Sequence, residues 1–215
     1  MTSKRSGFKL IQRGADKTLL LIPGWATDHR IFASLDLPYD YLLPVEFALP
    51  DFGKRLLMAL EKEMLGRISI LGWSLGGFLA ADFAANNKGR IDELILVGVK
   101  RGYKKTDIDK IKGYIRRNRA AYLRKFYDEC PVEEGLKRVY LEEMDIATLM
   151  EGLDYLSGAE IIPERLKGLD VRFVHGENDR IAPIDEARAL AKGLEGSEFS
   201  EIKGAGHFPC RQKRS

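Results

Sequence analysis

Five short apolar runs recur along the chain, each bounded by Gly, Pro or charged residues, and they predict the strands of one sheet. They cover residues 19–22, 68–71, 94–97, 171–174 and 199–202. Their hydrophobicity is continuous rather than alternating, which is typical of strands covered on both faces. We therefore predict an α/β fold with a mostly parallel, doubly wound sheet.

The segments between these runs carry helical patterns. Apolar residues at helical spacing mark residues 52–65 and 184–194, and residues 75–85 form a run of small and apolar side chains. Alternation of such helices with strands is the pattern expected for a sheet flanked by helices.

A long stretch without a strand-like run separates residues 99 and 171, about seventy residues where a crossover needs far fewer. Two helical faces mark this stretch, and their members are Ile108, Ile111, Ile115, Tyr122 and Phe126, then Leu149, Leu153 and Leu156. We predict a helical cap over residues 103–160, inserted into a core formed by residues 1–102 and 161–215.

Composition narrows the class of protein. A chain of 215 residues with 45% hydrophobic and 31% charged residues fits one globular domain and excludes disordered, collagen-like and membrane-bundle classes. The basic N-terminal stretch lacks the apolar core of a signal peptide, so we expect a cytoplasmic protein. Two cysteines, without a CxxC motif or clustered Cys and His, predict neither a disulfide framework nor a metal site, and no cofactor is expected.

The net charge of +3 conceals an asymmetry. Residues 100–126 contain eleven Lys and Arg against two Asp, so this segment carries +9 and the remainder −6. The run is either a solvated helix face or a positive docking surface beside an active site. The candidate binding residues in it are Arg116, Arg117, Arg119, Arg124 and Lys125.

A GxSxG sequence follows the second predicted strand. That strand leads into Gly72-Trp73-Ser74-Leu75-Gly76-Gly77 and then into an apolar helix. This strand–turn–helix context is typical of a nucleophile elbow, in which glycines leave room for a sharp turn that exposes the serine. Ser74 is the candidate nucleophile, and a purely structural serine in a glycine turn is the less favoured alternative.

A serine nucleophile needs an imidazole base. His207 lies in Gly204-Ala205-Gly206-His207, after the last predicted strand, and is the candidate. We expect His175 to pack or hydrogen-bond below the site and His29 to lie in an early turn.

The base needs a carboxylate that orients its ring. Asp179 follows the strand at residues 171–174, at the carboxyl end where α/β sheets bind ligands, and is the candidate. Glu177 and Asp170 are its rivals, but Asp170 precedes the strand and belongs to the opposite end of the sheet.

An oxyanion formed at Ser74 needs hydrogen-bond donors. The backbone N–H of Leu75 is one candidate, and the N–H of Trp25, in the loop after the first predicted strand, is the other. Trp25 and Trp73 adjoin this centre and are either walls of an acyl pocket or core aromatics; we favour the pocket.

These motifs together resemble the α/β-hydrolase superfamily, from about residue 19 to the C-terminus, and the order Ser74, Asp179, His207 is the order of its catalytic residues. The pairing of Gly24-Trp25 with Gly-Trp-Ser-Leu-Gly-Gly most resembles the pimeloyl-[acyl-carrier protein] methyl ester esterases of biotin synthesis. This resemblance implies hydrolysis of a methyl ester on an acyl chain carried by acyl-carrier protein, with cap arginines docking the acidic carrier. We expect a monomer.

Two features depart from the family pattern. The sequence ends eight residues after His207, with no room for the family's final helix, so we expect either a minimal variant or a truncated chain, with a histidine loop less well braced than in relatives. The cap sequence matches no family motif, so its basic residues are assigned only as a patch.

The leading hypothesis is therefore a serine carboxylesterase. The alternative is an esterase, thioesterase or C–C hydrolase for small free substrates, for which the basic run only aids solubility. A noncatalytic or nucleic-acid-binding protein is least favoured, because base-reading motifs with interleaved aromatics are absent from the sequence.

Overall fold

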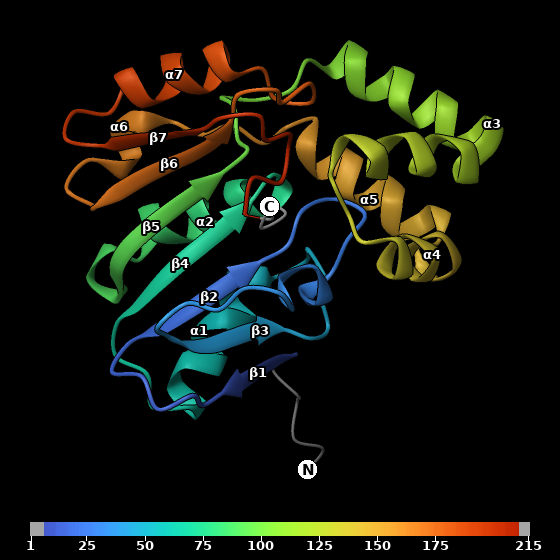
Figure 1. The fold of residues 1–215 in the computed structure, drawn as a ribbon. Helices are drawn as coiled ribbons and strands as arrows, with labels where there is room; N and C mark the ends of the chain where they lie inside the picture. The colour runs from blue at the N-terminus through green and yellow to red at the C-terminus, as the bar shows by residue number, and fades with distance from the viewer. Residues whose placement is uncertain (1–6, 211–215) are drawn as a thin grey trace.

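The computed structural model describes residues 7–210 and contains a seven-stranded sheet in the order β1-β3-β2-β4-β5-β6-β7 (Figure 1). Only β1 is antiparallel to its neighbour, and the other neighbouring pairs are parallel. The predicted mostly parallel α/β sheet is confirmed. The strands are β1 (Phe8–Ile11), β2 (Thr18–Ile22), β3 (Asp40–Pro44), β4 (Ile68–Trp73), β5 (Ile91–Val97), β6 (Val171–Gly176) and β7 (Glu198–Ile202).

Burial differs between the central and the outer strands. Every residue of β2 and β4 is buried, as the continuous apolar runs predict. The expectation of full burial is wrong for β7, whose residues are exposed or half-buried, because this strand pairs only with β6 at the sheet edge. Strands β1 and β3 were not predicted from the sequence.

The helices of the core lie between these strands. They are α1 (Phe52–Lys62), α2 (Leu75–Asn86), α6 (Pro163–Leu166) and α7 (Ile184–Lys192), with short 3-10 helices η1 (His29–Phe32) and η2 (Lys88–Arg90). Helix α2 contacts both α1 and α6 and packs on β4 and β5. Helix α1 ends before the predicted residue 65, because Met64 adopts a left-handed φ of 53° that an α-helix cannot continue.

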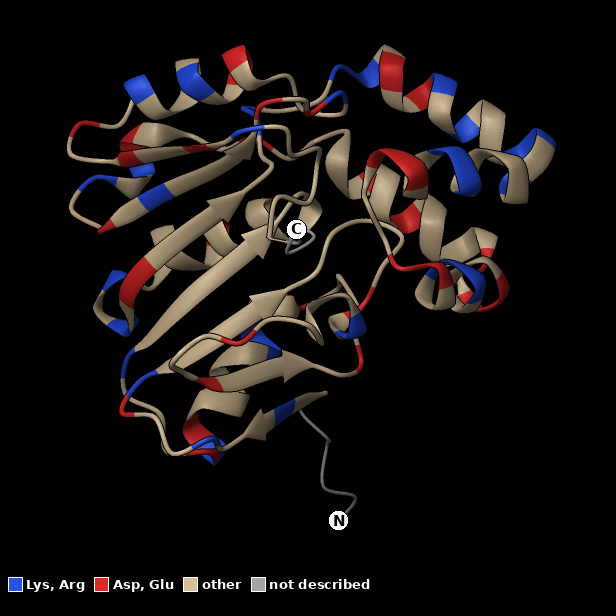
Figure 2. Ribbon diagram, in the orientation of Figure 1, with Lys and Arg blue, Asp and Glu red and all other residues tan. Residues whose placement is uncertain are grey.

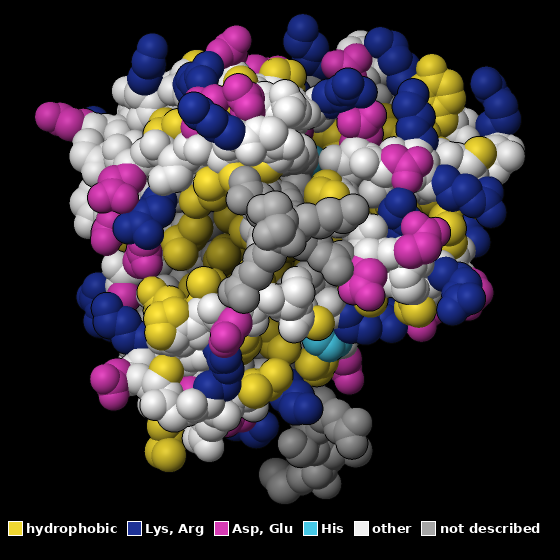
Figure 3. Space-filling model, in the orientation of Figure 1, with side chains coloured by type: hydrophobic (Ala, Val, Ile, Leu, Met, Phe, Trp, Pro, Cys, Tyr) yellow, Lys and Arg dark blue, Asp and Glu magenta, His cyan; other side chains and the backbone are white. Residues whose placement is uncertain are grey.

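The opposite face of the sheet is less covered. Ile95 of β5 and Val174 of β6 are half-buried, whereas Leu94 and Leu96, on the face that α2 covers, are fully buried. Figure 3 shows hydrophobic side chains gathered in a hollow on the face turned to the viewer.

Residues 103–160, which we name the cap segment, form three helices beside the carboxyl ends of the strands (Figure 1). They are α3 (Lys105–Glu129), α4 (Glu134–Glu143) and α5 (Ile146–Leu156). An isolated bridge between Gly102 and Glu160 closes the base of the segment. Helix α3 bends at Asn118, whose side chain accepts a hydrogen bond from the N–H of Ala121 (3.0 Å) and so caps the second half.

The expectations for the basic N-terminal stretch and for the polar C-terminal end fall partly on residues that the structure does not describe. The N-terminal residues 1–6 and the polar stretch 211–215 lie outside the described residues. Within residues 7–210, no helix has the length and apolar character needed to cross a membrane.

Candidate active site

Ser74 occupies a strained turn between β4 and α2. Its backbone angles, φ 53° and ψ −118°, lie in a region that non-glycine residues rarely adopt. A Cβ on Gly72 would come within 2.4 Å of the Gly76 carbonyl oxygen, and one on Gly76 within 2.3 Å of the Ile22 oxygen. Because neither glycine carries a Cβ, the backbone can make the tight turn that places Ser74 at the end of β4.

The three predicted side chains meet in one hydrogen-bonded row. His207 Nε2 lies 2.8 Å from Ser74 Oγ, and His207 Nδ1 lies 2.8 Å from Asp179 Oδ2. A carboxylate only accepts, so Nδ1 carries the proton and Nε2 of the neutral ring is free to accept one from the serine. All three residues are buried, which strengthens these interactions.

Asp179 is held as an ionised carboxylate. Its Oδ1 accepts the N–H groups of Ile181 and Ala182, both at 2.9 Å. Burial alone would raise the pKa of Asp179, but hydrogen bonds from His175, His207 and the Ala182 N–H outweigh it and lower the pKa below its usual value.

His175 contacts the Ala182 carbonyl and the Asp179 carboxylate, and the contact with Asp179 was not predicted from the sequence. Its Nε2 lies 2.7 Å from the Ala182 carbonyl and 3.2 Å from Asp179 Oδ2. The carbonyl can only accept, so Nε2 carries a proton that also faces the carboxylate. His175 is fully buried beside Asp179.

The alternative candidates lie apart from His207. Glu177 is exposed, and its carboxylate accepts the Gly204 N–H (2.8 Å), so it holds the histidine loop without touching the ring. Asp170 immediately precedes β6, at the opposite end of that strand from Asp179. His29 begins η1, and burial lowers its pKa.

The loop that carries His207 is held by contacts with β4 and α3. The Trp73 indole N–H donates to the His207 carbonyl (2.8 Å), and the His207 N–H lies 3.4 Å from the Glu129 carbonyl of α3. Phe208 is buried, with its ring centroid 4.6 Å from that of Trp73. The assignment of Trp73 to an acyl-pocket wall is therefore corrected: this indole is fully buried and supports the histidine loop from below.

Two backbone N–H groups, of Leu75 and Trp25, are the oxyanion donors predicted for Ser74. Leu75 is the first residue of α2, so its N–H has no partner within the helix, and the helix N-terminus favours negative charge. The Trp25 N–H follows β2 and donates to no backbone carbonyl of the described residues. The close approach of Gly76 to the carbonyls of Ile22 and Pro23 brings these two stretches of backbone together.

The Trp25 side chain lies against the cap segment. Its Nε1 donates to the Leu149 carbonyl of α5 (3.0 Å), and its ring packs edge-on against Phe126 of α3 at 4.9 Å. Trp25 and Leu75 line a small, mostly apolar cavity of about 40 Å³. The other lining residues are Gly24, Ala26, Thr27, Phe47, Leu49, Met144, Thr148, Leu149, Glu151 and Gly152.

Tyr103 is a further side chain at the nucleophile that sequence reasoning missed. Burial is the main cause that raises the pKa of its phenol, the charge of Asp179 adds to it, and the nearby Ser74 hydroxyl acts in the opposite direction. The sequence feature that could have identified Tyr103 is its position just after β5, at the same end of the sheet as Ser74.

The basic residues of the cap segment differ in exposure. Arg116, Arg117, Arg124 and Lys125 are exposed, and within residues 7–210 none of them forms an ion pair. Arg119 is corrected: its partly buried guanidinium donates to the carbonyls of Leu141 and Met144 and ties α3 to the chain around α4.

The positive charge is confined to part of the cap segment. Residues 103–160 contain eleven basic and twelve acidic residues, a net charge of −1. Figure 2 shows most of the basic residues of the cap segment on α3, with acidic residues on α3 as well and both signs on α4, and Figure 3 shows both signs interspersed along the outer edge. The positive surface predicted from the sequence is therefore local to α3.

Within residues 7–210, the cysteines form no disulfide and the metal-ligating side chains form no candidate metal site. Cys130 is a buried free thiol whose pKa is raised by burial and by the charges of Asp179 and Glu129, and Cys210 is also free. No group of His, Cys, Asp or Glu within residues 7–210 is arranged to hold a metal ion.

Comparison with known proteins places this geometry in a family. The sequence is 25% identical over 231 residues to a pimeloyl-[acyl-carrier protein] methyl ester esterase of Aromatoleum aromaticum, covering 89% of this chain and 91% of that protein. It is 23% identical over 225 residues to a 2-hydroxy-6-oxononadienedioate/2-hydroxy-6-oxononatrienedioate hydrolase of Escherichia coli, covering 93% and 72%. An esterase from Exiguobacterium antarcticum shares the fold, with a TM-score of 0.78 over 93% of this chain and 87% of that chain at 17% identity.

The family model described as Alpha/beta hydrolase family matches residues 19–213, nearly the whole chain. The resemblance inferred from the motifs is confirmed at this level, and the comparisons support a hydrolase that resembles esterases. The chain belongs to the α/β-hydrolase family.

Proposed function

We propose that the protein is a serine ester hydrolase. The observation that carries the proposal is the row of two 2.8 Å contacts that joins Ser74 Oγ to His207 and His207 to Asp179. A serine activated in this way suits nucleophilic attack on an acyl carbon.

In the acylation step, Ser74 Oγ attacks the ester carbonyl carbon and its proton passes to His207 Nε2. The carbonyl oxygen becomes an oxyanion that accepts hydrogen bonds from the N–H groups of Trp25 and Leu75. Asp179 stabilises the His207 imidazolium that forms when the ring takes this proton. The tetrahedral intermediate then collapses, the bond to the leaving alkoxide breaks, and His207 returns the proton, so an alcohol departs.

In the deacylation step, water takes the place of the alcohol. His207 removes a proton from the water as it attacks the acyl-Ser74 carbon, and the same backbone donors hold the second oxyanion. Collapse releases the carboxylic acid and returns the proton to Ser74. Neither step requires a cofactor.

For the substrate we propose a methyl ester at the end of an acyl chain that is carried on acyl-carrier protein. The relative from Aromatoleum aromaticum bears this activity in its name. The exposed Arg116, Arg117, Arg124 and Lys125 on α3 offer a positive surface to an acidic carrier. The small cavity beside Trp25 and Leu75 has a mostly apolar lining, which suits contact with part of an aliphatic chain.

The second candidate is hydrolysis of a small free substrate, including a C–C bond. The relative from Escherichia coli, matched over 93% of this chain, favours it by name. The near-neutral charge of the whole cap segment favours it too, because acidic residues of α4 and α5 offset the basic face of α3.

The test compares three substrates with the purified protein and its Ser74→Ala variant. We expect release of methanol from methyl pimeloyl-carrier protein with a kcat/KM well above that for a short p-nitrophenyl ester. A lower kcat/KM on the carrier-bound ester than on the free methyl ester would favour the small-substrate alternative. Activity that survives in Ser74→Ala would contradict the serine mechanism altogether.

A further inference from the structure

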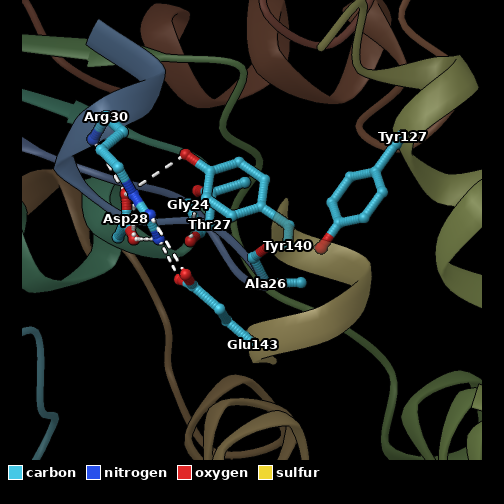
Figure 4. A network of polar contacts seen from close by, with 8 residues as sticks. All are labelled: Gly24, Ala26, Thr27, Asp28, Arg30, Tyr127, Tyr140 and Glu143. Carbon is cyan, nitrogen blue, oxygen red and sulfur yellow. Dashed lines mark hydrogen bonds and ion pairs between the residues drawn. The ribbon is translucent and has the colours of Figure 1, made fainter. Parts of the chain in front are cut away.

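The loop after β2, residues 24–30, is held by hydrogen bonds from within and from the cap segment (Figure 4). Inside the loop, the Thr27 hydroxyl donates to the Gly24 carbonyl at 3.0 Å. From α3, the Tyr127 hydroxyl donates to the Ala26 carbonyl at 2.7 Å. Thr27 and Tyr127 are almost fully buried, so water does not compete for these carbonyls.

The first of these bonds fixes the direction of the Trp25 N–H. The Gly24 carbonyl and the Trp25 N–H belong to one planar trans peptide and point in opposite directions. While Thr27 holds the carbonyl on one side, the N–H must face the other side. A rotated peptide would turn the carbonyl oxygen toward the place where negative charge develops, and repulsion would replace a hydrogen bond.

The second bond acts on a strained residue. Ala26 has a φ of 59°, in the left-handed region that costs a non-glycine residue energy and persists only where its surroundings impose it. The Tyr127 hydroxyl lies on the Ala26 carbonyl, and the buried Thr27 follows directly. The cap segment therefore helps to impose the turn that follows Trp25.

The far end of the loop is joined to α4. Asp28 caps η1 by accepting the Arg30 N–H (2.9 Å), and the Tyr140 hydroxyl of α4 lies 3.3 Å from the same carboxylate. Arg30 forms ion pairs with both Asp28 and Glu143 of α4 (Figure 4). The loop is thus joined to α3 at Ala26 and to α4 at Asp28 and Arg30.

We propose that Thr27 is a positioning residue for the Trp25 amide and that the Tyr127 hydroxyl couples the position of this amide to the seating of the cap segment. The inference rests on the proposed function, because it gives the Trp25 N–H the role of oxyanion donor. Thr27 also lines the small cavity beside Trp25, and the role proposed for it here acts through the Gly24 carbonyl rather than through a contact with the substrate.

The test uses a substitution that keeps the shape of Thr27 and removes its hydroxyl. Thr27→Val should lower kcat for a p-nitrophenyl ester by about 10- to 100-fold, less than the 10²–10³-fold that follows complete loss of an oxyanion donor. KM should stay within about threefold, because the donor acts on the transition state. Thr27→Ser should restore most of kcat, because it restores the hydroxyl.

The matched control is Thr18→Val, a second buried threonine at the opposite end of β2 from the loop. It should keep the kcat of the unchanged protein, to within about twofold on the same transition-state argument. Tyr127→Phe should lower kcat in the same direction as Thr27→Val but by less, and it carries the test should Thr27→Val fail to fold. A Thr27→Val kcat within twofold of the unchanged protein, or a Tyr127→Phe kcat equal to it, would overturn the respective half of the proposal.

Crystal structures separate failure of this inference from failure of the proposed function. In Thr27→Val the Gly24 carbonyl should leave the position it holds in the unchanged protein, and in Thr27→Ser it should keep it. An unmoved carbonyl in Thr27→Val would overturn the positioning role whatever the activity. An unchanged protein that hydrolyses no ester would refute the proposed function, while the carbonyl position would still decide the structural role of Thr27.

Discussion

The indole N–H of Trp73 donates to the backbone carbonyl of His207, so the residue before the candidate nucleophile supports the candidate base. The bond joins β4 to a loop 134 residues later in the chain and is buried at both ends. Phe208 packs on the same indole. One side chain of the GxSxG motif therefore holds the loop that carries His207 against β4.

Replacing Trp73 with Phe should impair both stability and catalysis. The change leaves a buried carbonyl without its donor, which costs about 1–3 kcal/mol of unfolding free energy, and lets the His207 loop shift. We expect kcat to fall by about tenfold or more, since small misplacements of reacting groups are costly. Urea unfolding and ester hydrolysis measure the two effects.

Tyr41→Phe is the control for this change. Tyr41 is a buried aromatic of β3 whose hydroxyl accepts the Leu37 N–H (2.7 Å), and β3 lies outside the site. This variant should lose stability and keep kcat. If Trp73→Phe also kept kcat while losing stability, the support of His207 by the indole would be structural only.

Replacing Asp179 with Asn should separate the proposed carboxylate from its nearest rival. Loss of a triad carboxylate lowers kcat by about 10⁴-fold while leaving binding in place. Glu177→Gln should be mild, because Glu177 contacts the Gly204 N–H and not the ring of His207. Steady-state kinetics of both variants decide the assignment, and reversed effects would move it to Glu177.

The same carboxylate should make stability depend on pH. Burial alone would raise the pKa of Asp179, but its hydrogen bonds lower the pKa in the folded state. Its stabilising contribution is therefore complete above the unfolded carboxyl pKa of about 4 and is lost as the pH falls toward the lower folded pKa. The unfolding free energy of the unchanged protein should fall more steeply below about pH 4 than that of Asp179→Asn. Parallel pH profiles from urea unfolding would contradict this.

Charge reversal on α3 should affect only a carrier-bound substrate. Arg116→Glu with Arg117→Glu, or Arg124→Glu with Lys125→Glu, should lower kcat/KM for a carrier-bound ester, more so at low salt, because exposed charges are screened. Hydrolysis of a small neutral ester should stay within about threefold, because the triad is untouched. Lys167→Glu with Lys192→Glu, on exposed residues outside the cap segment, is the control. Equal losses on both substrates would indicate a damaged cap segment, and no loss on either would remove the docking surface.

The central strands and the motif residues were predictable from the sequence for related reasons. Burial on both faces leaves β2 and β4 with uninterrupted apolar runs. Strand β3 escaped notice because it begins with Asp40 and ends with Pro44, and its pairing depends on distant strands. Ser74 could be located because a strained turn admits few residue types on either side of it.

The contacts between the core and the cap segment could not be predicted. The Tyr127 hydroxyl reaches a carbonyl 101 residues away, and only the seating of α3 brings the two together. Likewise, helical spacing does not reveal that Arg119 turns inward to bind carbonyls while Arg116 and Arg117 stay exposed. Such choices depend on packing between elements rather than on local pattern.

Labelling with a serine-directed fluorophosphonate tests the central claim, that Ser74 is the activated nucleophile, most directly. Mass spectrometry of the intact protein and of its peptides should find one adduct, on Ser74, formed together with loss of esterase activity. Ser74→Ala should remain folded, since only a hydroxyl is removed, and should take up no label. An adduct on another residue, or an active Ser74→Ala variant, would contradict the account.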